Sequence, residues 1–393
     1  MQKLETMKFA RTSQPIRRVG SAVLVVLTLL ALAGASSSIV PLYGNSAGNI
    51  ESASITELKT GWVVTAVCNS KAKLEMIVWN DTGTALARKG TYTATRDCVG
   101  VAVTTLNDST VVTVNGAQAS FAFEVTAWQV SSTGSISPLG TTAASCATCG
   151  AGSVSIATLD ATRVVTASIT SDYALLVSAW LVPSNGDITL QGSAQATGTF
   201  SNTPGITAPN SSQVITAGPA GNCGQVACDL EVISWNVDGS GDVVEQNTAQ
   251  AGVSGYVGAI SWNSNTVVTP LINSSHDLEL ISWSVSSGGV ITRQAAGTAG
   301  QVQLSPIAAC IIPTDNLPFT AVYDSSSYLA AEVWEPSGSS GLKELTTDDT
   351  KLLQFAIGAV PIGPHRVVTA AATEPNIKLE LEEWELESSS ADN

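Results

Sequence analysis

Two residue types that can bind sugars recur together along this chain. A glutamate stands four residues before five of seven regularly spaced tryptophans, and these glutamates are Glu75, Glu124, Glu231, Glu279 and Glu380. An indole ring can cover the apolar face of a sugar ring while a carboxylate accepts hydrogen bonds from the hydroxyl groups. The first chemical hypothesis is therefore a ring of glycan sites, with these glutamates as the candidate ligand-binding residues.

The geometry of a strand limits this hypothesis. Residues four apart in a strand share a face but stand about 13 Å apart, roughly twice the width of a sugar ring. A pocket would therefore have to combine a glutamate from one repeat with a tryptophan from the next. In the alternative interpretation, the tryptophans pack as core between repeats and the glutamates hydrogen-bond backbone groups or threonine hydroxyl groups. The spacing favours this structural interpretation, and the glycan sites remain as the alternative.

Six of the seven cysteines have positions that suit disulfides. Cys223 and Cys228 flank an insertion that lengthens their repeat, so we expect a local bond between them. Cys146 and Cys149 have CxxC spacing, but an all-β unit offers no helix N-terminus to lower a thiol pKa. A zinc site would need two more ligands, and the whole chain has two histidines. We therefore expect a second local disulfide between Cys146 and Cys149.

The remaining cysteines connect or occupy the repeats themselves. Cys68 ends one strand and Cys98 precedes the first strand of the next repeat, so a disulfide between neighbouring repeats is feasible. Cys310 lies in an apolar strand and is expected to be a free core thiol. All six paired cysteines would then lie in loops on one face. Rigid loops lose little entropy on binding, which makes this face a candidate ligand surface; simple stiffening of the protein is the alternative.

The tryptophans also define the architecture that must position these residues. They are Trp79, Trp128, Trp180, Trp235, Trp283, Trp334 and Trp384, about fifty residues apart, and a threonine recurs in step with them within Val-Val-Thr-Ala or a close variant. One repeat reads as four strands, Ser153–Leu159, Arg163–Ile169, Tyr173–Val182 and Asp187–Gly192. Seven all-β units of this length indicate a ring. Residues 38–386 resemble the seven-bladed β-propeller superfamily, which implies four-stranded antiparallel blades.

The two ends of the repeat region are complementary. After Trp384 too few residues remain for a turn and a fourth strand. The segment Ser38–Gly44 resembles Ser135–Gly140, which is the outer strand of an earlier repeat. We therefore expect the mature N-terminal strand to complete the last blade, which removes exposed strand edges at the gap.

The N-terminal residues have the pattern of a targeting segment. A basic stretch precedes an apolar run from Ala22 to Ala33, too short to span a bilayer, and Ala33-Gly34-Ala35 fits a cleavage site. We expect a signal peptide over 1–35, a propeller over 36–387 and a C-terminal tail over 388–393. The expected location is secreted, either extracellular or periplasmic.

Composition narrows the partners. The formal net charge is −15, which repels phosphate backbones and anionic lipid, so we expect no nucleic-acid partner and no membrane insertion. The acidic loop Asp238–Asp242 has too few spaced oxygen atoms for a cation and is interpreted as a hairpin turn. His276 and His365 are placed on opposite faces, so no catalytic pair is predicted. We expect no cofactor and no metal, and a monomer.

Two further features have open interpretations. Trp62 and Trp262 fall outside the repeat, near turns on the face opposite the cysteines, where they would be recognition residues if exposed and core if packed. The last repeat holds Glu380, Glu382, Glu383, Glu385 and Glu387 within eight residues. We interpret this acidic run as a solvated outer strand, with binding of a cation or a basic partner as the alternative.

These observations predict an exported binding or scaffold propeller that recognises a glycan or a protein partner through its disulfide-stiffened loop face. The sequence leans against an enzyme because it shows no nucleophile–base pair. The alternative function is a glycan hydrolase or lyase that uses carboxylates near the central channel. An enzyme predicts converging acidic residues, a lectin predicts repeated shallow pockets with exposed aromatic rings, and a scaffold predicts an uneven apolar patch on one face.

Overall fold

The structure is a computed structural model that describes residues 37–116, 123–144, 149–221, 228–337, 341–350, 354–373 and 377–388. The predicted signal peptide over 1–35 lies outside these residues. Of the predicted tail only Ser388 is described, as the last residue of a strand. The compact unit formed by Ser37–Glu387 is all β. Within the described residues no helix has the length and hydropathy needed to cross a bilayer.

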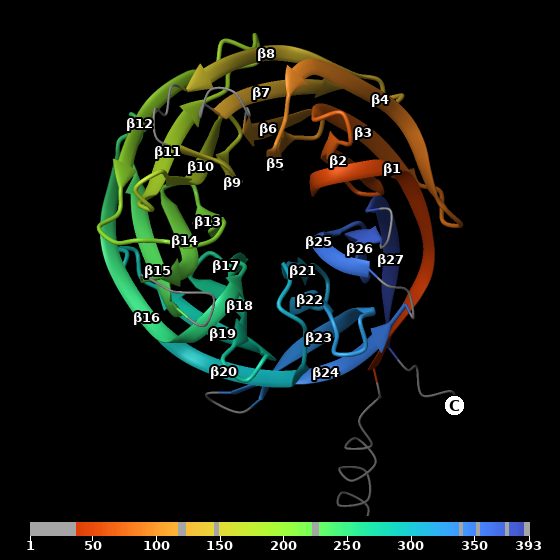
Figure 1. Cartoon of the computed structure of the whole chain (residues 1–393), viewed down its shortest axis with the longest axis vertical. Helices are drawn as coiled ribbons and strands as arrows, with labels where there is room; N and C mark the ends of the chain where they lie inside the picture. Colours follow the sequence, from red (N-terminus) through yellow and green to blue (C-terminus); the bar gives the residue numbers. More distant parts are fainter. Residues whose placement is uncertain are drawn as a thin grey trace, which may run out of the picture. The chain divides into compact units, whose positions relative to one another are not determined.

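The strands follow one another in chain order, four to a blade (Figure 1). Blade 1 contains the second half of β1 (Ser37–Lys59), with β2 (Trp62–Asn69), β3 (Lys73–Asp81) and β4 (Leu86–Asp97). Blade 2 contains β5 (Gly100–Asn107), β6 (Thr110–Gly116), β7 (Phe123–Val130) and β8 (Ile136–Ala144). Blade 3 contains β9 (Cys149–Asp160), β10 (Arg163–Thr170), β11 (Leu175–Leu181) and β12 (Thr189–Gln195).

Four more blades complete the ring seen in Figure 1. Blade 4 contains β13 (Gly205–Asn210), β14 (Gln213–Ala220), β15 (Cys228–Val237) and β16 (Val243–Val257). Blade 5 contains β17 (Ile260–Asn263), β18 (Thr266–Asn273), β19 (Asp277–Val285) and β20 (Ile291–Gln301). Blade 6 contains β21 (Ala308–Ile312), β22 (Leu317–Tyr323), β23 (Leu329–Ser337) and β24 (Gly341–Asp349). Blade 7 contains β25 (Gln354–Pro361), β26 (Arg366–Thr373), β27 (Lys378–Ser388) and the first half of β1.

Residue types explain where each strand lies in its blade. The second strand of a blade, such as β2 or β26, has six consecutive buried residues rich in valine, threonine and alanine. Both of its faces pack against neighbouring blades, so it lacks the alternation of a half-exposed strand. The fourth strand alternates instead, as β4 does with its mostly polar sequence Leu86–Asp97. The hydrophobic core therefore lies between blades, and the fourth strands form the rim.

The predicted closure of the ring is confirmed. Strand β1 is the neighbour of both β27 and β2, so one continuous strand ends blade 7 and begins blade 1. The crossover is fixed by a backbone hydrogen bond from the Ile50 N–H to the Ile377 carbonyl, at 2.9 Å. In Figure 1 the first part of β1 runs beside β27. The first and last strands of the propeller are thus joined within one sheet, which leaves no open strand edge at the seam.

The repeated tryptophans are core residues, as the structural interpretation predicted. Each is between 0 and 2% exposed and packs against the blade that precedes its own. Trp79 of blade 1, for example, packs with Val368 and Leu381 of blade 7. Each indole N–H donates to the repeated threonine of its own blade, at 2.9–3.0 Å. The Thr–Trp repeat is therefore a structural device that occurs once per blade.

Candidate functional site

The five repeated glutamates occupy separate blades and do not converge. Glu75 accepts a hydrogen bond from Arg88 at 3.0 Å and Glu279 one from Arg293 at 3.3 Å, in each case from the adjacent fourth strand. Glu124 pairs with Arg96 of the neighbouring blade. These pairs lie near the surface, where an ion pair contributes little to stability. The pairing with arginine was not foreseen, because the strand pattern indicated only backbone and threonine partners.

The other two glutamates have different surroundings. Glu231 is 8% exposed, and burial raises the pKa of its carboxyl, partly offset by a hydrogen bond with Gln250. Glu380 lies on β27 opposite Ala371. Since all seven repeated tryptophans are buried, none presents an open indole face next to its glutamate. The five glutamates therefore remain candidate ligand residues that share a strand position but not a common environment.

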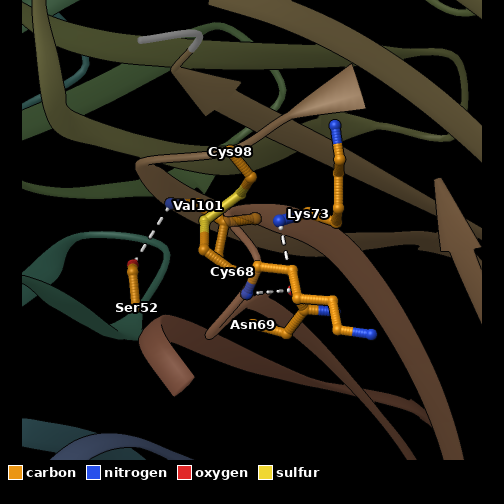
Figure 2. The surroundings of a disulfide bond; sticks show 7 residues. Ser52, Cys68, Asn69, Lys73, Cys98 and Val101 are labelled. Atoms are coloured by element: carbon orange, nitrogen blue, oxygen red, sulfur yellow. Dashed lines mark hydrogen bonds between the residues drawn. A yellow bond between two sulfur atoms is a disulfide. The ribbon is translucent and has the colours of Figure 1, made fainter. Parts of the chain in front are cut away.

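The disulfide between neighbouring blades is present. Cys68 at the end of β2 and Cys98 just before β5 are bonded, with their Cα atoms 5.2 Å apart and both residues fully buried (Figure 2). Ser52 lies directly opposite Cys68 in the β1–β2 register, and its hydroxyl oxygen accepts a hydrogen bond from the Val101 N–H at 3.3 Å. The disulfide therefore joins blade 1 to blade 2 beside the first residues of both inner strands.

The other predicted disulfides are described only in part. Cys228, the first residue of β15, is disulfide-bonded, whereas its predicted partner Cys223 lies outside the described residues. Cys146 also lies outside them, and Cys149 is described only as the backbone start of β9. Cys310 is a free and buried thiol, as predicted, and burial raises its pKa far above the ordinary value.

A cavity of about 430 Å³ opens at the mouth of the central channel, on the face that carries the disulfides. All seven blades contribute to its wall, chiefly through residues near the starts of their inner strands; typical lining residues are Ser52, Val101, Val154, Gly205, Tyr256, Ile307 and Ile357. Tyr256 counts toward blade 5, because the last residues of β16 leave blade 4 and pair with β18. Its volume lies within the range of ligand pockets. The cavity lies close to both bonded cysteines in the strand register. Ser52, which lines it, is paired with Cys68. Tyr256, which also lines it, follows two residues after Ser254, the register partner of Cys228. We call this cavity the channel mouth.

Ile377 is an unusual residue at the rim of the channel mouth. It lines the cavity, is 45% exposed and has a φ of 43°. A β-branched side chain in this left-handed region is strained, and a large exposed apolar side chain adds no burial in return. Leu304, 50% exposed, lies on the same face beside His276 in a second hollow. This face of the propeller therefore carries large apolar side chains that are not packed in the hydrophobic core.

Carboxylates are sparse along this part of the channel. Glu51 is the one charged side chain that lines the mouth among the described residues. Glu57 lies six residues further along β1, about 20 Å away in an extended strand, and burial raises the pKa of its carboxyl. The two are too far apart for the paired-carboxylate cleavage of a glycosidic bond, which needs about 5–9 Å. In the part of the chain that the structure describes, no group of three or more His, Cys, Asp or Glu side chains is placed to hold a metal ion.

The histidines lie in turns on different faces. His276 sits at a φ of 65° in a turn that Asn273 caps, its Oδ1 accepting from the N–H groups of Ser275 and Asp277. His365 pairs through Nδ1 with Asp315 of blade 6, at 2.7 Å. This contact was not predicted, because its partners are fifty residues apart and meet only when blades 6 and 7 pack.

The predicted hairpin turn at Asp238 is present. The Asp238 carboxylate accepts hydrogen bonds from the N–H groups of Ser240 and Asp242, at 2.8 and 3.0 Å. These hydrogen bonds lower the pKa of the Asp238 carboxyl, with the Ser240 hydroxyl as the largest contributor. The Asp238 carboxylate therefore holds the turn.

The two extra tryptophans are half-buried contacts between blades. Trp62 packs against the cluster shared by blades 1 and 2, with Lys59 Nζ 4.9 Å from its ring centroid. Trp262 packs between blades 5 and 6, and its indole N–H donates to the Asn316 carbonyl at 2.8 Å. Both tryptophans are therefore packing residues rather than freely exposed recognition residues.

The prediction of a solvated outer strand for the acidic run was wrong. Strand β27 is the third strand of blade 7 and is flanked by β26 and β1. Glu383 is fully buried and pairs with Arg366 Nη1 at 2.6 Å, and the same guanidinium reaches Asp81 of blade 1 at 2.7 Å. Burial is the largest single influence on the pKa of Arg366 and lowers it, but the two carboxylates together outweigh burial, so the pKa is raised. The signal against a solvated outer strand was Trp384 within the run, because the repeated tryptophan lies on the third strand of each blade and the predicted N-terminal strand covers that strand in blade 7.

Comparisons with known proteins add information on the fold. No family model and no curated protein matches the chain. Among solved structures, the β-propeller domain of Cps50 (Swd1) from Myceliophteria thermophila has a TM-score of 0.56 at 6% identity, covering 89% of this chain and 100% of that one. The C-terminal WD40 domain of Sif2 has a TM-score of 0.52 at 11% identity, covering 89% and 99%.

A protein from Lactobacillus plantarum is also similar, with a TM-score of 0.53 at 11% identity, covering 78% of this chain and 90% of that one. At such identities these likenesses show the fold alone. They agree with the β-propeller architecture, and the strand pairing of this chain shows that its first and last blades share one strand. The chain is a seven-bladed β-propeller whose N-terminal strand completes the last blade.

Proposed function

We propose that this chain is an exported binding propeller and that the channel mouth holds an uncharged segment of a protein partner. The observation that carries the proposal is the cavity of about 430 Å³ to which all seven blades contribute. Its wall combines apolar side chains such as Val101, Val154 and Ile307 with a single carboxylate, that of Glu51. Pockets of this kind favour ligands that bury apolar surface and place few polar groups.

Rigidity supports the same proposal. The Cys68–Cys98 disulfide and the bonded Cys228 lie beside mouth residues in the strand register. A preorganised site loses less conformational entropy when it binds, so more of the contact energy appears as affinity. The strained and exposed Ile377 also fits a recognition role, because exposed apolar side chains at a rim become buried when a partner docks.

A protein partner is favoured over the ring of glycan sites. The repeated tryptophans that would stack on sugars are buried, and three of the five glutamates already pair with arginines. The proposal of export is supported by the predicted signal peptide over 1–35 and by the preference of disulfides for oxidising compartments.

The proposal can be tested with two tryptophan substitutions. Thr203 is exposed and lines the mouth, so Thr203→Trp fills the cavity without disturbing the core. Ser264 is exposed in the β17–β18 turn on the opposite face, so Ser264→Trp is the matched control. Proteins captured by the immobilised domain from the surface of the producing cell should be lost with Thr203→Trp and retained with Ser264→Trp.

A second variant separates affinity from folding. Ile377→Gly removes an exposed side chain and relieves a strained φ, so it should leave the melting temperature unchanged or raise it while weakening capture. Equal capture by the wild-type domain and by both mouth variants would show that the channel mouth is not the binding site.

A further inference from the structure

A small pocket of about 120 Å³ lies between blades 1 and 2, away from the channel mouth. Tyr92 and Arg96 of β4 form one wall, and Asn115, Glu124 and Trp128 of blade 2 form the other. At about 30 Å³ per water molecule, the space holds on the order of four waters. That is room for one edge of a sugar ring with a few of its hydroxyl groups, and the rest of the ring would lie outside the pocket, in solvent.

Asn115 is the residue that indicates a ligand. It is 1% exposed, and its Oδ1 has no hydrogen-bond partner among the described residues, although it lines the pocket. A buried acceptor without a donor costs about 1–3 kcal/mol. Asn115 lies opposite Glu124, and its counterpart in blade 1, opposite Glu75, is the apolar Val67. A ligand hydroxyl group that donates to Asn115 Oδ1 would remove the free-energy cost of having a buried asparagine where blade 1 has a valine.

The other polar groups of the pocket fit neutral hydroxyl groups. Arg96 and Glu124 form an ion pair across the two blades, so the site offers both donors and acceptors with no net charge. Thr126 and Thr141 add two hydroxyl groups whose oxygen atoms are 3.1 Å apart. Sugar hydroxyl groups both donate and accept, so one could donate to Asn115 Oδ1 while others bridge the arginine and the glutamate. A cation or an anion would instead compete with one member of the pair.

Aromatic rings supply the apolar side of the pocket. The Tyr92 ring meets the Trp128 ring edge to face, with centroids 5.3 Å apart and an interplanar angle of 63°. Tyr92 is half-buried, whereas Trp128 is 2% exposed. A sugar ring can therefore contact Tyr92, which the periodic glutamate–tryptophan pattern did not single out.

The wall formed by β4 is held in place. Lys73 pairs with Asp97 at 2.7 Å and also donates to the Thr95 carbonyl at 2.8 Å. The next residue, Cys98, is fixed by its disulfide to Cys68. A wall fixed at its end keeps the gap between the blades at a constant width, which favours a small rigid ligand.

We propose that the pocket between blades 1 and 2 is a binding site for a single sugar ring, with Asn115, Arg96 and Glu124 as its hydrogen-bonding residues and Tyr92 as its apolar contact. The site is independent of the channel mouth and uses one of the five candidate glutamates. It predicts a single site at this seam rather than a repeated ring of sites.

The test uses the whole mature domain labelled with ¹⁵N on its tryptophan indoles. A panel of methyl glycopyranosides, comprising the glucoside, galactoside, mannoside and N-acetylglucosaminide, is titrated while the indole N–H signals are recorded. At least one glycoside should shift the Trp128 signal saturably, because Trp128 lines the pocket. Asn115→Leu and Arg96→Gln should each weaken that binding roughly tenfold or more, as the loss of a hydrogen bond involving a charged or buried group does.

Control variants assign the binding to this pocket. Glu279→Gln changes the same strand position in blade 5, where the glutamate also pairs with an arginine, and should leave the titration unchanged. Thr203→Trp, which closes the channel mouth, should also leave it unchanged. Arg96 is 59% exposed, so its variant keeps the fold even if Asn115→Leu does not. The proposal is overturned if no glycoside of the panel shifts Trp128, or if Arg96→Gln binds as tightly as the wild-type domain.

Discussion

The indole N–H of Trp79 donates a hydrogen bond to the hydroxyl oxygen of Thr65 at 3.0 Å, with both residues fully buried. The threonine lies on the second strand and the tryptophan on the third, and the tryptophan packs against the preceding blade. One polar bond thus satisfies the only polar group of a large core side chain, and the same bond recurs in every blade. The regular spacing of threonine and tryptophan in the sequence reflects this hydrogen bond.

Replacing the acceptor should destabilise the domain. Thr65→Val keeps the shape of the side chain but leaves the Trp79 N–H buried without a partner, which costs about 1–3 kcal/mol of unfolding free energy. The measurement is the midpoint of denaturant unfolding at an unchanged m-value. In a Trp79→Phe background the donor is absent, so the same substitution should cost far less. An equal cost in both backgrounds would show that the bond is not the cause.

Glu332 should make the stability fall as pH rises. It is 6% exposed, and burial, with Glu344 nearby, raises its pKa to about 8 from 4.5, against a hydrogen bond with Thr320 that lowers it. Between pH 4.5 and about 8 the folded state holds a proton that the unfolded state has released. The unfolding free energy should therefore decrease by roughly 1.4 kcal/mol per pH unit across that window.

Glu332→Gln should remove this part of the pH dependence and stabilise the domain at neutral pH. The check is a series of denaturant titrations between about pH 5 and pH 8 on both proteins, which spans the window between the two pKa values. Parallel stability curves for the wild-type domain and the variant would contradict the assignment to Glu332.

Removing the disulfide between blades 1 and 2 should cost more than most single changes. The bond closes a segment with a sequence separation of 30, and the loop-entropy relation gives about 3–4 kcal/mol for that length. Cys68→Ala with Cys98→Ala avoids placing polar atoms in a fully buried site. Thermal unfolding of the double variant, with and without a reductant, measures the effect. A reductant should lower the wild-type melting temperature more than that of the variant, and equal melting temperatures without reductant would contradict the assignment.

The seam between blades 7 and 1 should depend on Arg366. Its guanidinium lies between the carboxylates of Asp81 and Glu383. Their side chains are 5% and 0% exposed, respectively. Arg366→Met leaves these buried carboxylates without that charge, which typically costs about 3–5 kcal/mol. Arg293→Met breaks a pair with an arginine 47% exposed and should cost less than about 1 kcal/mol. Similar losses in the two variants, measured by denaturant unfolding, would refute a special role for the seam.

The periodic residues were sufficient to predict the fold, because every Thr–Trp pair does the same job in its own blade. Closure was also predictable, since Ser38–Gly44 resembles a fourth strand and the last repeat lacks one. Contacts between blades were harder. Arg366 of blade 7 meets Asp81 of blade 1 only when ring closure brings the two ends of the propeller together, and no local pattern indicates it.

The candidate sites were less predictable than the fold. The channel mouth is built from residues contributed separately by seven blades, such as Val101 and Val154, which share no chemical signature. The positive φ of Ile377 could not be predicted from the sequence, because β-branched residues rarely adopt that conformation. The pattern of glutamates did include Glu124, but the orphan Oδ1 of Asn115 appears only once the blades are packed.

The central claim is that a partner docks on the channel mouth, and hydroxyl-radical footprinting of the captured complex tests it most directly. Ile377 and Tyr256 line the mouth, whereas Leu190 and Val244 are about half exposed on the fourth strands of blades 3 and 4. The account predicts that the partner lowers the oxidation of Ile377 and Tyr256 and leaves Leu190 and Val244 unchanged. Protection confined to Leu190 and Val244, with the mouth residues oxidised as in the free domain, would contradict it.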